Sequence, residues 1–380
     1  MTQSQILNEN AQLAWDTILH KPTCGIPSWL IHPMEHRIID QLADHPEGSY
    51  AQDPENVYIA MQRRIGTCML DQYIPRNPLT LGSHGYKADA PKSATTGAET
   101  IVRDGMTIDS PEAVVEHLEK FEFQKMRQQS STFDETARIR DIIENEQKVQ
   151  SALGASILKV PYGVIRFPRF RYGQYGYENY FMAYALYPDV LEKDFSLQAD
   201  QACQINTATA RAYADGHLPP LIRLDHDMAD SRGTLVDIKS LDKIWFPHFA
   251  RALAPVLKTP INMIWHCDGN LSQMLPRLLD VGLKGFQGFQ YEDGMDYEKI
   301  CAMKTRTGED LIIIAGVSVT RTLPQGTPDD VRKEMAFLVE KGPKTGLFLG
   351  GSSSIAPGVS WANTKALVDG FAYYRTHARG

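Results

Sequence analysis

The sequence is poor in cysteine, and its few cysteines are not arranged for crosslinking. Five stand among 380 residues without any short paired spacing: Cys24, Cys68, Cys203, Cys267 and Cys301. Disulfide frameworks and zinc knuckles need an even or closely clustered set of thiols. Neither class is therefore predicted, and reduced thiols in the cytoplasm are the simpler expectation.

Long apolar runs and an excess of basic residues are also lacking. No run approaches the roughly 20 residues that cross a bilayer, and the polar start lacks the charged-then-apolar order of a signal peptide. The net charge is −7, and Lys and Arg are scattered, which gives no footprint for nucleic acid. We expect a cytoplasmic protein without a membrane or nucleic acid as its main partner.

The second half of the chain contains five apolar runs that each end in a polar cluster. They cover residues 220–224, 261–265, 285–290, 311–315 and 346–349. Continuous apolar runs suit parallel strands covered on both faces, and a helix-like pattern follows each. This alternation predicts a TIM (β/α)8 barrel, whose active face is formed by the loops after the strands.

We expect a single domain over residues 1–380, with residues 1–150 rich in helical additions and with inserted loops, because the chain exceeds the usual length of a bare barrel. Helices are predicted near 54–65, from Pro111 after a Ser110 cap, and over 134–150. Residues 79–97 lack periodicity and are expected to form a loop, either a lid over the barrel mouth or a tether.

Aromatic residues gather in two places that could form a ligand pocket. A short strand at 26–30 places Trp29 and His32 at a strand end facing the cavity. Residues 156–187 are dense in Phe and Tyr, including Tyr177 and Tyr180. Aromatic side chains most often simply pack in a core; the alternative is a wall for a flat or aromatic substrate.

The sharpest polar cluster is the segment 266–270 after the second apolar run. Alternate residues leaving a strand point the same way, so His266 and Asp268 are expected on one side and Cys267 on the other. An imidazole and a carboxylate placed together can share a proton, orient a hydroxyl or bind a metal. We take both as candidate catalytic residues.

Two further carboxylates are predicted to join this cluster. In Asp225-His226-Asp227 the two carboxylates share one side, so the cavity is expected to receive either them or the imidazole; Asp227 and Glu292 are the catalytic candidates. The alternative is that one Asp caps the next helix or pairs with Arg223 or Arg232. His266, Asp268 and Glu292 could together ligate zinc, although the set is poor in thiolates. The last run ends in Gly350, Gly351, Ser352 and Ser353, where backbone N–H groups could hold an anion or a cofactor tail; a tight turn is the alternative.

These motifs, taken in order, resemble the uroporphyrinogen decarboxylase superfamily, and within it the branch of cobamide-dependent methyltransferases and O-demethylases. The resemblance runs from about Trp15 to the C-terminus. It is carried by the segments 21–27, 227–233, 266–270, 316–327 and 352–363.

The resemblance implies a methyltransferase that moves a methyl group from a small donor, an aryl methyl ether by preference, to Co(I) of a corrinoid. It also implies a small corrinoid-binding protein as partner and a homodimer. Thiol-methylating relatives bind zinc through a His-x-Cys pair and a later Cys, where this chain has His266, Asp268 and Ser353. The arginine-rich motif expected of a true uroporphyrinogen decarboxylase has no equivalent in residues 26–37, so decarboxylation of a carboxylic acid is the alternative function.

Overall fold

A computed structural model describes residues 7–77, 79–81, 101–288, 291 and 294–377. Most of the predicted loop at 79–97 therefore lies outside the described residues. The helices are α1 (Glu9–Ile18), α2 (His36–Ala43), α3 (Ser49–Gln52), α4 (Pro54–Ile65), α5 (Pro111–His117), the π-helical turn η1 (Leu118–Glu122), α6 (Phe123–Ser131), α7 (Glu135–Leu153), α8 (Tyr172–Tyr175), α9 (Tyr177–Leu186), α10 (Pro188–Asp215), α11 (Ile238–Ile244), α12 (Phe246–Leu257), α13 (Leu275–Val281), α14 (Tyr297–Ala302), α15 (Thr322–Gln325), α16 (Pro328–Lys341) and α17 (Trp361–His377).

The five apolar runs form one parallel sheet, as predicted. Its strands stand in the order β11-β10-β9-β8-β5, and all neighbours are parallel. Their bounds are β5 (Leu221–Asp225), β8 (Asn262–His266), β9 (Gly285–Gln287), β10 (Ile312–Val317) and β11 (Leu347–Gly351). Nearly every residue of these strands is buried, because helices cover the sheet on one face and side chains fill the other.

Short segments from the first half of the chain close this sheet into a barrel. The backbone N–H of Trp29 donates to the backbone oxygen of Leu349 in β11, at 2.7 Å. The same segment also pairs with Met69 of β1 (Met69–Leu70). Strand β1 is parallel to β4 (Leu158–Lys159), and Tyr162 bridges to Arg223 of β5. The ring therefore runs 28–30, β1, β4, β5, β8, β9, β10, β11, and the TIM barrel class is confirmed.

The first 150 residues thus supply barrel wall as well as additions. Their predicted helices are present, and Asp53, Ser110 and Asp134 each cap one through a side-chain oxygen. Two small hairpins lie outside the ring: β2 (Ile101–Arg103) with β3 (Met106–Ile108), and β6 (Ala229–Asp230) with β7 (Gly233–Thr234).

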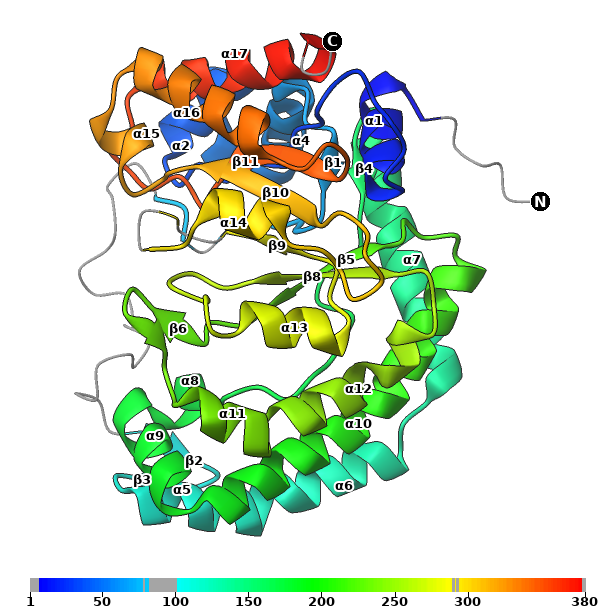
Figure 1. The fold of residues 1–380 in the computed structure, drawn as a ribbon, viewed down its shortest axis with the longest axis vertical. Coiled ribbons are helices and arrows are strands. Elements are labelled where there is room, and N and C mark those ends of the chain that lie inside the picture. The colour runs from blue at the N-terminus through cyan, green and yellow to red at the C-terminus, as the bar shows by residue number, and fades with distance from the viewer. Residues whose placement is uncertain (1–6, 78, 82–100, 289–290, 292–293, 378–380) are drawn as a thin grey trace.

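Helices wrap the barrel on the two sides seen in Figure 1. The C-terminal helices α16 and α17 lie above the strands, and α11, α12 and α10 lie below them. Helix α10, which was not predicted from the sequence, packs against α12, α7 and α6. Among the described residues no helix combines the length and the apolarity that crossing a bilayer requires.

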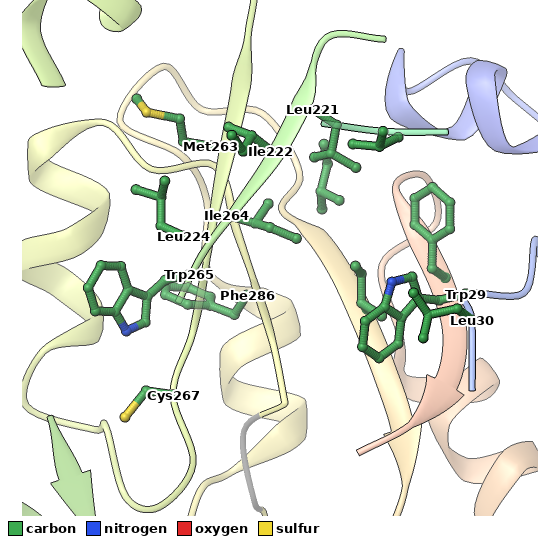
Figure 2. Packing of buried hydrophobic residues seen from close by; sticks show 14 of the residues in the cluster. Trp29, Leu30, Leu221, Ile222, Leu224, Met263, Ile264, Trp265, Cys267 and Phe286 are labelled. Carbon is green, nitrogen blue, oxygen red and sulfur yellow. The ribbon is translucent and has the colours of Figure 1, made fainter. Parts of the chain in front are cut away.

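Alternation along the strands separates the helix-facing core from the barrel interior. Leu224, Trp265 and Cys267 point to one side of strands β5 and β8, away from Trp29 and Leu30 on the opposite wall (Figure 2). Trp265 is fully buried and packs edge-on against Phe249 of α12. The intervening residues, Arg223, Asp225 and His266, line the interior cavity.

Candidate active site

A cavity of about 160 Å³ opens at the carboxyl ends of the strands. Residues from widely separated parts of the chain line it: Trp29, Leu30, His32, Gln72, Arg223, Asp225, His266, Gln287, Ser353 and Ser354. Most of these side chains are polar. In a TIM barrel this end carries the chemistry, so the cavity is the candidate active site.

Arg223 stands at the centre of the cavity wall and is 4 % exposed. Its Nε donates to Oδ2 of Asp71 at 2.8 Å, and its Nη1 donates to Oδ2 of Asp225 at 3.1 Å and to Oε1 of Gln287 at 3.2 Å. Its guanidinium also lies over the rings of Tyr162 and Trp29, at 4.8 and 5.3 Å from their centroids. The cation is therefore fully engaged by the protein.

Asp71 is the buried counter-ion of this guanidinium. Its Oδ1 accepts from Trp29 Nε1 at 2.9 Å, which also fixes the indole against the cavity. Burial alone would raise the pKa of Asp71, but the charge and hydrogen bonds of Arg223 outweigh it and hold that pKa below its usual value. A buried charge left without its partner is strongly destabilising, so Asp71 and Arg223 are expected to stay together. The pair forms the fixed inner surface of the site, called its floor below.

Asp225 connects this floor to His266. Its Oδ2 accepts from Tyr162 and Arg223, at 2.8 and 3.1 Å, which leaves Oδ1 facing His266 Nε2 at 4.0 Å. Asp227 belongs to the same group, because ligand atoms of Asp225, Asp227 and His266 all lie within 4.8 Å of one another. Of the two alternatives left open by the sequence, the cavity receives the carboxylate side, with Asp225 in its lining and His226 outside it.

His266 is 9 % exposed and held by its other ring nitrogen. Nδ1 lies 3.3 Å from the backbone oxygen of Gln287. A carbonyl oxygen can only accept, so Nδ1 carries the proton and Nε2 faces the carboxylates. Gly288 adopts φ +73°, and a Cβ there would stand 2.3 Å from His266 Nδ1; the close approach of this backbone to the imidazole requires glycine.

Asp268 lies beside this group. Its backbone N–H donates to Asp227 at 3.3 Å, and its own Oδ1 is buried without a hydrogen-bond partner among the described residues. Burial, with the nearby carboxylates of Asp227 and Asp225, raises the pKa of Asp268. A raised pKa makes this carboxyl a better proton carrier than an exposed aspartate. Glu292, the remaining catalytic candidate, lies outside the described residues.

Trp29 and His32 both line the cavity, where the sequence placed them. The His32 ring stacks on Tyr58 with 5.8 Å between centroids. Burial lowers the pKa of His32 to about 4, so the imidazole is neutral at physiological pH. Its Nε2 is buried and has no hydrogen-bond partner among the described residues, which makes it free to contact a ligand.

The glycine and serine segment at the end of β11 serves mainly to close the barrel. Gly350 lies against the indole of Trp29, where a Cβ would approach a ring carbon to 2.9 Å. Gly351 pairs in register with Val317. The N–H of Ser352 donates to Val317, and its hydroxyl accepts from Val319 N–H. Only Ser353 of the four cofactor-binding candidates lines the cavity, and their binding of a cofactor tail stays a prediction.

Most of the aromatic stretch packs as core and does not wall the cavity. Tyr180 is fully buried and lies parallel to Tyr175, with 6.4 Å between centroids. Tyr177 is 36 % exposed and stacks on Tyr172 at 4.4 Å. The hydroxyl of Tyr172 donates to the backbone oxygen of Asp227, so Tyr177 lies near the site through Tyr172, whereas Tyr180 belongs to the core.

A thiol-activating zinc site does not fit these residues. Cys267 is not among the residues that line the cavity with His266, its Sγ accepts from the N–H of Met228, and burial raises the thiol pKa to about 12. The described groups around His266 are carboxylates, which suit harder cations as well as zinc. Zinc held by His266, Asp268 and Glu292 stays a prediction.

Sequence reasoning offered a pair of Arg223 with one of the two carboxylates as an alternative, which Asp225 forms, but it missed Asp71 and Tyr162 as members of the same network. One signal was present, since Arg223 interrupts an otherwise apolar strand, and a charged residue inside a barrel strand needs a buried partner. Its partner Asp71 follows a strand of only two residues, too short to produce a recognisable pattern.

Comparisons with known proteins agree with this architecture. Residues 226–373 match the family model of uroporphyrinogen decarboxylase (URO-D). A methyltransferase from Methanosarcina mazei shares the fold with a TM-score of 0.57 at 15 % identity, over 97 % of this chain and 99 % of that one. A B12-independent methionine synthase from Shewanella sp. W3-18-1 aligns less well, with a TM-score of 0.37 at 11 % identity, over 61 % and 64 %.

No curated protein sequence matches the chain significantly. The family match begins at His226 and ends at Tyr373, and so covers the segments around His266, Gly316 and Ser352 on which the resemblance was based. The fold of the whole chain is that of the Methanosarcina protein. The predicted resemblance to the uroporphyrinogen decarboxylase superfamily is thereby confirmed.

Proposed function

We propose that the chain is a methyltransferase that moves a methyl group from a small donor to Co(I) of a corrinoid carried by a separate protein. The observation that carries the proposal is the group of Asp225, Asp227, Asp268 and His266 at the open end of the barrel, above a cavity sized for a small molecule. The fold shared with a methyltransferase supports the reaction class.

The cavity is large enough for a small methyl donor and too small for the corrinoid that would accept the methyl group. A cavity of ~150 Å³ in another protein takes one benzene molecule, so about 160 Å³ accepts a ligand of similar size. A corrin macrocycle is far larger and would have to meet the donor from outside. This division suits a corrinoid presented by a partner protein at the barrel mouth.

In this proposal the chain positions the methyl carbon and manages the leaving group. Co(I) is itself a strong nucleophile, so an in-line geometry supplies much of the rate. Trp29 and His32 would orient the donor from one wall. His266 and Asp268 would hold or deliver a proton at the leaving atom, while Arg223 and Tyr162 keep Asp225 oriented.

An aryl methyl ether was the donor favoured by the sequence. Its methyl transfer releases a phenolate, which a protonated Asp268 or His266 would neutralise. A single methoxylated ring is comparable in size to the cavity. The aromatic wall expected from residues 156–187 is absent among the described lining residues, which leaves Trp29 as the one ring of that lining that could face such a donor apart from the imidazoles.

The alternative function, decarboxylation without a corrinoid, is less compatible with the charges of the site. A carboxylate substrate needs a free cation, and the Arg223 guanidinium in the cavity already bonds two carboxylates, Asp71 and Asp225. A further carboxylate would meet Asp225 and Asp227 at close range. We therefore place methyl transfer ahead of decarboxylation.

A spectrophotometric assay tests the proposal. The protein is mixed with Co(I) corrinoid, free or bound to a corrinoid protein, and with methoxyarenes, methylamines or methyl thioethers. Conversion of Co(I) to methyl-Co(III) with one donor class supports methyl transfer. Stable Co(I) across the panel, together with CO2 release from a small acid, would replace it with the decarboxylase function.

A further inference from the structure

We propose that the methyl donor is a small N-methylated ammonium cation, bound through its positive charge and its N–H groups by the carboxylates around His266. This inference rests on the proposed function and names the substrate class of the same site. It follows from the charge and hydrogen-bonding character of the cavity.

The first observation is an excess of negative charge. Among the described residues that line the cavity or contact its lining, four carry carboxyl groups and two carry guanidinium groups: Asp71, Asp225, Asp227, Asp268, Arg169 and Arg223. Arg169 donates to the backbone oxygen of Asp225 at 2.7 Å, and Arg223 is bonded to two of the carboxylates. Four carboxylates against two guanidinium groups leave this set with an excess of negative charge when all are ionised.

The second observation is that the free groups are acceptors. Asp225 Oδ1 faces the cavity side of His266, and Asp268 Oδ1 is buried without a partner. His32 is a neutral imidazole whose buried Nε2 also lacks a partner. Buried acceptors without donors are costly, so a bound ligand that supplies both N–H groups and positive charge would satisfy them.

A neutral ether or a carboxylate lacks these properties. An ether oxygen is an acceptor and supplies no donor to Asp225 Oδ1, Asp268 Oδ1 or His32 Nε2. A carboxylate adds like charge within a few ångströms of Asp225. An ammonium group supplies both the missing N–H donors and the missing positive charge. The Trp29 indole in the wall gives its N-methyl groups an apolar surface.

The same contacts activate the leaving group. The Co(I) electron pair forms the bond to the methyl carbon as the C–N bond breaks, and the C–N pair stays on nitrogen. The amine then leaves neutral and keeps its proton, so no external acid or oxidant is required. The carboxylates favour the protonated amine, which is the form that can leave.

Calorimetric titration of the wild-type protein without corrinoid tests the binding. Trimethylammonium at neutral pH is compared with tert-butanol, a neutral molecule of similar shape, with anisole and with isobutyrate. We expect trimethylammonium to bind at least about tenfold more tightly than each of the other three, as a charge-assisted contact provides. Tighter binding of anisole or isobutyrate, or no binding of trimethylammonium, overturns the inference.

Two variants locate the effect. Asp225→Asn keeps the shape of the side chain and should weaken trimethylammonium binding by about tenfold or more. Asp230→Asn is the matched control, since Asp230 pairs with Arg232 on the exposed β6–β7 hairpin, and it should leave binding unchanged. Equal binding by both variants and the wild type overturns the assignment to this site.

The titration tests the cationic donor and the Co(I) assay tests methyl transfer, so a negative result in one can be told apart from a negative result in the other. Trimethylammonium that binds but transfers no methyl group contradicts the proposed methyltransferase and leaves the cation site standing. Methyl transfer from an anisole, with no binding of trimethylammonium, supports the methyltransferase and refutes the cationic donor.

Discussion

Two histidines leave neighbouring strands at nearly the same level and meet opposite surroundings. Asp225 and His266 are partners in register, and the N–H of His226 donates to the backbone oxygen of His266 at 3.3 Å. His266 faces the cavity and its carboxylates. His226 faces outward into Phe167, Phe170 and Tyr172.

The surroundings give the two imidazoles different capacities. His226 Nε2 accepts from the N–H of Phe170 at 2.9 Å, and burial lowers its pKa to about 3. It therefore stays neutral and acts as a structural acceptor. His266 has one nitrogen held by a carbonyl and the other open to Asp225. One residue type thus serves packing on one face of the strands and proton chemistry on the other.

The largest effect is expected from removing His266, the histidine that faces the cavity. His266→Ala should lower turnover by roughly 10²–10⁴-fold, the usual contribution of a positioned acid or base. The loss of stability should stay at about 1–3 kcal/mol, because the protein contact that is removed is a single hydrogen bond to Gln287. Steady-state kinetics and a thermal melt measure both, and full activity in the variant would remove His266 from the mechanism.

The second largest effect is expected from removing the Arg223 guanidinium, which holds Asp71 and Asp225 in place at the cavity wall. Arg223→Met leaves Asp71 buried without its counter-ion and should destabilise the protein by about 3–5 kcal/mol in urea unfolding. The double variant Arg223→Met with Asp71→Leu should recover part of that loss. Unchanged stability in the single variant would show that the network carries no buried charge.

The outer histidine should affect stability and not activity. His226→Ala removes the acceptor of the Phe170 N–H and opens space among the rings, at a cost of about 1–3 kcal/mol. The rate per folded molecule should stay near that of the wild type. A loss of turnover as large as that of His266→Ala would contradict the division between the two faces.

A pH titration of stability sharpens the same contrast. The pKa of His226 is lowered from its ordinary 6.5 to about 3, so the unfolded chain binds this proton first. Its contribution is complete above pH 6.5 and is lost as the pH falls toward 3. Relative to His226→Gln, which keeps an acceptor but does not titrate, the wild type should lose on the order of 5 kcal/mol over that range, since each unit of pKa difference corresponds to about 1.4 kcal/mol.

Comparison with the Gln variant is necessary because another group has the opposite sign. Burial raises the pKa of Glu334 from 4.5 to about 7, so its contribution is complete below pH 4.5 and is lost as the pH rises toward 7. Both proteins contain Glu334, and the difference between their unfolding curves removes it. A difference that does not vary with pH would show that His226 is not buried in the neutral form.

The wall that carries His266 could be predicted, whereas in the wall that completes the ring only the segment 26–30 could be predicted. Strands β5, β8 and β10 contain long apolar runs and lie within one or two residues of their predicted bounds. Strands β1 and β4 are two residues long, and β4 includes Lys159, which pairs with Glu146. A short strand with a buried lysine has no apolar period to detect.

The site divides in the same way. The alternation of His266 and Cys267 follows from strand geometry alone, and the structure shows it. The contacts of Arg223 with Asp71 and of Asp225 with Tyr162 join residues 152 and 63 positions apart. No local pattern encodes such distances. Whether Tyr180 packs in the core or lines the ligand cavity likewise depends on which helix covers it.

The closure of the barrel through isolated bridges has a consequence for how this scaffold can be altered. From β5 to β11 the strands are joined by ladders of three to five paired positions, whereas the segments at Trp29 and Tyr162 join their neighbours through single bridges. Trp29 is nevertheless fixed, because its indole bonds to Asp71 and packs on Gly350, so a change of bulk there would disturb both. Libraries that redirect donor size therefore belong at Leu30 and His32, which line the cavity from the same segment, and the half with His266 is best left untouched.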